Sequence, residues 1–64
     1  MITIKINFNG IDIRTDNTFG DIVSILRERE IDFEINYNGY ISISKENAFK
    51  TLLELSFIYD IEII

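Results

Sequence analysis

The sequence contains no cysteine, no histidine and no tryptophan. Without thiols and imidazoles it can form no disulfide bond, none of the usual zinc sites and no nucleophilic arrangement of the Ser-His-Asp or Cys-His kind. We therefore expect a protein that is not an enzyme, with no catalytic residues, no metal site and no cofactor. The absence of cysteine is also compatible with a reducing compartment, and we expect the protein to be cytoplasmic.

Proline is absent as well, and no segment rich in glycine or serine divides the chain into two parts. No apolar run approaches the roughly 20 residues of a transmembrane helix. Lys5 and the alternating pattern around it are unlike the apolar region of a signal peptide. The 64 residues lie near the lower limit for a domain held together by its core alone. We therefore expect one domain over residues 1–64, without membrane contact.

Positive charge is scarce, because eleven acidic residues outnumber six basic ones and give a net charge of −5. A negative protein repels the phosphate backbone of nucleic acids and anionic membrane surfaces, so neither is an expected partner. The acidity either serves solubility alone or steers the protein toward a basic surface of another protein.

The first half of the chain predicts a hairpin followed by a helix. Apolar and polar residues alternate over 2–8 and again over 11–15, which is the pattern of strands with one buried face. Asn9-Gly10 lies between these segments, and this pair is favoured in two-residue hairpin turns. Over 18–30 the apolar spacing changes to that of an amphipathic helix.

The second half repeats this plan and adds a final strand. Alternation over 33–37 and 40–43 flanks Asn38-Gly39 and predicts a second hairpin. Helical spacing then runs over 46–55, and alternation returns over 57–63. The predicted order is therefore ββαββαβ.

Hairpins separated by amphipathic helices are typical of a two-layer α+β fold, with one sheet and both helices on the same face. If the last strand returns beside the first and pairs with it in parallel, the fold is a β-grasp, as in ubiquitin-like proteins. Another two-layer α+β fold with a different strand order is the alternative. The expected core residues are Ile4, Ile6, Phe8, Ile13, Phe19, Ile22, Val23, Leu26, Phe33, Ile35, Leu52, Leu55, Ile61 and Ile63.

The face of the sheet away from the helices is expected to be mostly polar. Ile58 and Ile64 are apolar exceptions on the last predicted strand. Together with Tyr40, and beside Asp60 and Glu62, they form the predicted partner-binding surface. The alternative is that these are scattered exposed apolar residues with no special role.

Three features resemble the ubiquitin-like sulfur-carrier proteins of the ThiS and MoaD type. They are the order ββαββαβ, the hairpin Ile35-Asn36-Tyr37-Asn38-Gly39 and the closing segment Asp60-Ile61-Glu62-Ile63-Ile64. In that family a mid-chain V-N-G hairpin and a final D-x-V-E-I strand are common. The resemblance covers most of the chain and implies a β-grasp domain of thiamin or molybdopterin biosynthesis. Its implied partner is an adenylating enzyme of the ThiF or MoeB type, in the same chain or in a separate one.

The working group of that family is a C-terminal Gly-Gly, whose carboxylate is adenylated and then converted to a thiocarboxylate. This sequence stops at Ile64 instead, and as written it is not expected to accept sulfur. The resemblance therefore implies a non-catalytic protein-interaction domain, such as the ThiS-like domain that precedes the enzyme in clostridial-type ThiF adenylyltransferases. The alternatives are a sulfur carrier whose diglycine tail is missing from the sequence, and an unrelated small acidic binding or regulatory protein.

Overall fold

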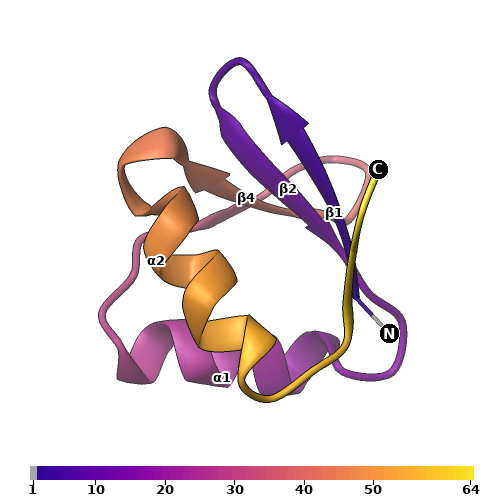
Figure 1. The fold of residues 1–64 in the computed structure, drawn as a ribbon, viewed down its shortest axis with the longest axis vertical. Coiled ribbons are helices and arrows are strands. Elements are labelled where there is room, and N and C mark those ends of the chain that lie inside the picture. The colour runs from indigo at the N-terminus through magenta and orange to yellow at the C-terminus, as the bar shows by residue number, and fades with distance from the viewer. Residues whose placement is uncertain (1) are drawn as a thin grey trace.

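One mixed five-stranded sheet and two helices form the two layers of this small α+β protein (Figure 1). The computed structural model describes residues 2–64. In chain order the elements are β1 (Ile2–Asn7), β2 (Gly10–Arg14), α1 (Phe19–Glu28), β3 (Glu34–Ile35), β4 (Ile41–Ser44), α2 (Lys45–Ser56) and β5 (Ile61–Ile63). The predicted order ββαββαβ is confirmed.

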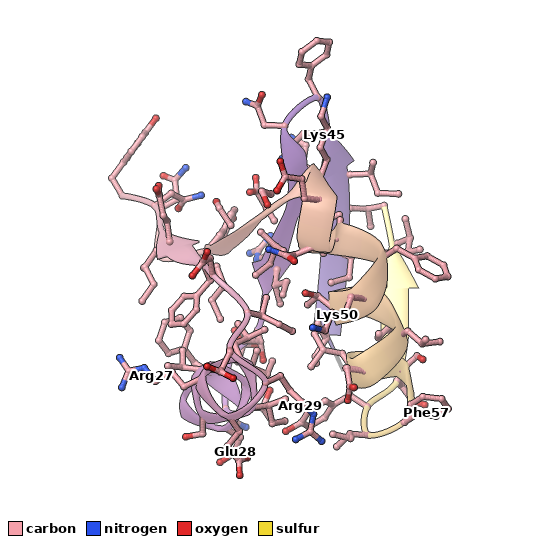
Figure 2. All side chains as sticks on the ribbon, turned by 90° about the vertical axis from the view of Figure 1, so that its left-hand side faces the viewer. Arg27, Glu28, Arg29, Lys45, Lys50 and Phe57 are labelled. Atoms are coloured by element: carbon pink, nitrogen blue, oxygen red, sulfur yellow. The ribbon has the colours of Figure 1, made fainter. Side chains whose placement is uncertain are left out.

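Figure 2 shows the strands in the order β3-β4-β2-β1-β5, from pink at the left to yellow at the right. The pairs β1 with β2, β2 with β4 and β3 with β4 are antiparallel, and β1 with β5 is parallel. In the parallel pair Ile2 lies beside Ile61 and Ile4 lies beside Ile63. The predicted parallel return of the last strand to the first is confirmed, and it leaves β5 at an edge of the sheet.

The core lies between the sheet and the two helices and is built from isoleucine and leucine. Alternation along β1, β2 and β4 directs every second side chain toward the helix layer. The buried apolar residues are Ile2, Ile4, Ile11, Ile13, Ile22, Leu26, Ile31, Ile41, Ile43 and Leu55. Partly buried residues packed against them include Phe19, Val23, Phe33, Leu52 and Ile61.

Four residues predicted for the core are exposed instead. Ile6, Phe8, Ile35 and Ile63 each expose more than half of their surface. Phe8 lies in a turn, Ile6 is next to that turn, and the other two lie on the edge strands β3 and β5. All four therefore lie outside the area of sheet that the two helices cover. The predicted core also lacked five residues that are buried, namely Ile2, Ile11, Ile31, Ile41 and Ile43.

The last predicted strand, over 57–63, is wrong in its first half. The amides of Ile58 and Tyr59 both bond to the carbonyl of Leu55, with N···O distances of 3.1 and 2.8 Å. These bonds form a turn directly after α2, so β5 begins only at Ile61. The third predicted strand is likewise shortened, because β3 contains only two residues.

The two hairpin turns share the sequence Asn-aromatic-Asn-Gly. In the first, the Oδ1 atom of Asn7 accepts a hydrogen bond from the amide of Asn9 at 2.9 Å, and the second hairpin repeats this bond at the same distance. Asn7 pairs with Gly10 in the ladder, so Phe8 and Asn9 are the turn residues. The prediction that Asn9-Gly10 forms the turn is therefore wrong by one residue.

Helix α1 ends in two hydrogen bonds of the Schellman pattern. The amide of Ile31 bonds to the carbonyl of Leu26 at 2.9 Å, and the amide of Glu30 bonds to the carbonyl of Arg27 at 3.2 Å. This turn brings Ile31 back into the core, where it is buried. It also places Glu30 at φ 56°, in the left-handed region that favours glycine.

Replacing Glu30 by glycine is expected to raise the free energy of unfolding by about 1 kcal/mol, because glycine adopts a left-handed conformation without steric strain. Urea denaturation followed by circular dichroism measures the change. Glu28→Gly is the matched control, since it removes the same side chain from a helical position of α1 and should lower stability by about 1 kcal/mol. A loss of stability in Glu30→Gly would contradict the expectation.

Candidate protein-interaction surfaces

Two of the predicted partner-binding residues, Glu62 and Ile64, lie on the face of the sheet that the helices leave uncovered. We call this face the open face. Glu62 belongs to β5, and the amide of Ile64 bonds to the carbonyl of Ile4 of β1 at 2.9 Å. Ile61 packs against the core, on the helix side of the sheet. Because successive side chains of a strand point to opposite faces, Glu62 and Ile64 point to the open face.

The other three predicted residues lie outside β5. Tyr40 precedes β4, and the guanidinium carbon of Arg14 lies 5.7 Å from its ring centre, in a cation–π arrangement. Strands β2 and β1 separate β4 from β5. Ile58 and Asp60 lie in the segment between α2 and β5, and Ile58 is 52% exposed. The structure thus distributes the five residues over three places, and their role in partner binding stays a prediction.

Hydrogen-bonded polar side chains lie on the open face between these places. The Oγ atom of Ser42 donates to Oδ1 of Asp12 at 2.8 Å and accepts from Nδ2 of Asn36 at 3.5 Å. Asp12 lies opposite Lys5 in the register of β1 and β2. This part of the open face therefore carries polar and charged groups rather than apolar ones.

An open apolar groove of about 330 Å³ lies between α2 and β5, on the helix side of the sheet. Its lining residues are Phe49, Leu52, Leu53 and Ser56 of α2 and Ile61 and Ile63 of β5. Phe49 is 77% exposed, and about half of Leu53 and of Ile63 is exposed. We call this feature the α2–β5 groove, and its lining contains no charged side chain.

The groove exists because α2 is apolar on more of its surface than the sheet can cover. Thr51 and Leu55 form the buried side of the helix. Phe49, Leu53 and Ser56 recur at i, i+4 and i+7, so they form a neighbouring ridge. That ridge projects toward the edge of the sheet, where β5 is the last strand. No further strand is present among residues 2–64 to cover it.

The α2–β5 groove was not expected from the sequence. Ile61 and Ile63 were expected in the core, although Ile63 is exposed, and the partner-binding surface was expected on the opposite face. The available signal was the pair Phe49 and Leu53, which widens the apolar side of α2 beyond a single stripe. This wider apolar side leaves Phe49 and Leu53 exposed beside β5.

A second, larger hollow of about 850 Å³ is lined mainly by asparagine, serine and acidic residues of the first hairpin, β4 and the segment before β3. Asp12, Asp32 and Glu34 are among its lining residues. Within residues 2–64 no group of three or more potential ligand side chains is arranged to hold a metal ion.

Neither α1 nor α2 combines the length and the apolar character needed to cross a membrane, and they are the helices described in residues 2–64. Comparisons with protein families, with curated proteins and with solved structures find no match to this chain. The fold and its exposed surfaces thus define the class of protein as a small α+β domain with an apolar groove at one sheet edge.

Proposed function

We propose that this protein is a protein-interaction domain without catalytic activity of its own. The observation that carries the proposal is the α2–β5 groove, where apolar side chains from two elements are exposed side by side. Contiguous exposed apolar surface on a small domain is typical of a binding site. Covering it with a partner removes apolar area from water, which is worth about 25 cal/mol per Å².

We also propose the more specific function of a ThiS-like β-grasp domain that works with an adenylating enzyme of the ThiF or MoeB type. The parallel pairing of β1 with β5 and the element order support it. The strand order differs in one respect. In ubiquitin-like β-grasp domains the last strand lies between the first strand and the second hairpin, whereas here β2 pairs with β4 and β5 lies at the edge.

Both levels of the proposal are tested by binding to a purified ThiF-type enzyme from the same source, measured by isothermal titration calorimetry. The protein is expected to bind, and Leu53→Asp is expected to weaken binding about tenfold or more because a carboxylate in the apolar groove must be desolvated. Ser24→Asp adds the same charge at an exposed position of α1 and should leave affinity unchanged. Circular dichroism verifies that both variants remain folded.

The possible results distinguish the general protein-interaction function from the ThiS-like function. If the wild-type protein fails to bind the enzyme, the ThiS-like function is wrong. If it binds and Leu53→Asp binds equally well, the enzyme uses another surface, and the groove loses its role in the proposal. Attachment of sulfur to the C-terminus of the wild-type chain during the incubation, detected by intact-mass spectrometry, would identify a carrier instead.

A further inference from the structure

We infer that the free edge of β5 binds an extended peptide segment in which apolar and basic residues alternate. The segment adds a sixth strand to the sheet, with its apolar side chains in the α2–β5 groove and its basic side chains beside Glu62. This inference rests on the proposed protein-interaction function and specifies the chemistry of the partner.

The backbone of β5 provides the first argument. The amide of Ile2 bonds to the carbonyl of Asp60 at 3.0 Å, and the amide of Ile64 also bonds to β1. In a parallel pair, alternate residues of a strand direct both backbone groups to the same neighbour. Ile61 and Ile63 therefore direct their N–H and C=O groups outward. Figure 2 shows β5, in yellow, as the last strand at the right of the sheet.

Natural edge strands are commonly protected by a very short length, charged side chains, proline, a bulge or a covering loop. β5 is three residues long and has one charged residue, Glu62, but it contains neither lysine nor proline. Its short length limits an added strand to the outward-facing groups of Ile61 and Ile63. The backbone groups of an incoming strand can therefore form hydrogen bonds with the outward N–H and C=O groups of Ile61 and Ile63, and no side chain of β5 blocks them.

The side chains of an added strand would meet two different environments. One set points to the helix side, where Phe49, Leu53 and Ile63 expose apolar surface. The other set points to the open face, beside Glu62. Apolar and charged residues at alternate positions match these two environments. A strand that pairs with an exposed edge gains affinity from its main-chain bonds and specificity from its alternate side chains.

Charge determines which kind of segment fits. A second copy of this chain could pair its own β5 with this edge. To use both Ile61 and Ile63, the two β5 strands would run antiparallel, with the pairing centred on Glu62. The two Glu62 side chains would then lie opposite each other. Like charges directly opposite are destabilising, and each copy carries a net charge of −5. Asp60 adds an acidic group directly before β5. A basic side chain opposite Glu62 is therefore favoured over self-pairing.

The test uses the protein and the synthetic peptide Thr-Ile-Lys-Ile-Lys-Ile-Thr, capped at both ends. Amide NMR spectra recorded during a titration are expected to change most at Ile61, Ile63 and the α2 residues of the groove. The matched peptide with glutamate in place of both lysines should bind about fivefold more weakly or worse. Glu62→Lys should reverse this preference, and Glu62→Gln should abolish it.

A third peptide keeps the lysines but carries N-methyl groups on the amides that would face β5. It should not bind, because it cannot donate the ladder hydrogen bonds. Equal binding of the methylated peptide, or NMR changes confined to the open face, would overturn strand addition. Equal affinity for the lysine and glutamate peptides would overturn the charge assignment.

Self-association is measured on the protein alone by sedimentation. A dimer of the wild-type chain that Ile63→Asp dissociates would show that a second copy occupies the edge, and it would overturn the inference. If no peptide binds while the adenylating enzyme still binds through the groove, strand addition fails and the proposed function stands. Loss of both would remove the proposed function itself.

Discussion

Replacing Gly10 by alanine is expected to lower the free energy of unfolding by about 2–6 kcal/mol, from overpacking and from a strained backbone, each worth about 1–3 kcal/mol. A Cβ atom at this position would overlap the carbonyl oxygen of Ile43 and lie 2.8 Å from the amide nitrogen of Lys45. Both are backbone atoms at the junction of β4 and α2, so they cannot move aside as a flexible side chain would. Gly10 also has φ +148°, which L-residues rarely adopt.

The expected loss is a large part of the total free energy of unfolding, which is about 3–10 kcal/mol for a chain of this length. Urea denaturation monitored by circular dichroism measures it, and a largely unfolded variant at zero urea is an acceptable result. Gly39→Ala is the matched control. It also has a positive φ, at +84°, but no atom lies within 4 Å of the added methyl group. Equal losses in the two variants would show that the contact with β4 has no effect.

Local pattern was enough to predict the order of the elements, and Gly10 shows where such information ends. Asn9-Gly10 correctly indicated a hairpin, although the turn residues are Phe8 and Asn9 and Gly10 already belongs to β2. The reason for glycine here is nevertheless the approach of Ile43 and Lys45, which are more than 30 residues away in sequence. A pairing of β2 with β4 cannot be deduced from the turn itself.

The predicted strand ends failed where a competing local structure was available. Alternation of apolar residues over 57–63 is genuine in the sequence, but the amides of Ile58 and Tyr59 bond back to Leu55 and complete the end of α2. Hydrogen bonds to the end of a neighbouring helix form without the entropic cost of bringing distant segments of the chain together. Of the strand predicted over 57–63, the alternating pattern was therefore right for the last three residues and wrong for the first four.

The candidate site was harder to predict than the fold, because it depends on what lies beside each strand. Glu62 and Ile64 were correctly placed on the open face by alternation alone. Ile63 was assigned to the core by the same rule, but β5 is an edge strand and Ile63 remains 56% exposed. The face of a residue follows from sequence, whereas its burial follows from the strand order and the position of the helices.

Replacing Ile4 by alanine is expected to lower the free energy of unfolding by about 2–5 kcal/mol, the range for deleting a buried isoleucine side chain. Ile4 is 0% exposed and lies between Ile13 of β2 and Ile63 of β5. Removing its side chain leaves a cavity that the surrounding strands and helices can close only in part. Ile6→Ala is the matched partner, because both isoleucines lie on β1, point to the same face and were predicted for the core.

Ile6 is 58% exposed, so its truncation should cost under about 1 kcal/mol, mostly through lost β-propensity and partial contacts. The two variants remove the same atoms from the same strand. The difference between their losses of unfolding free energy, measured by urea denaturation, therefore reports the difference in burial between Ile4 and Ile6. It maps how far the helix layer extends along β1 toward the first turn. Equal losses would mean that the helices also cover Ile6 in solution.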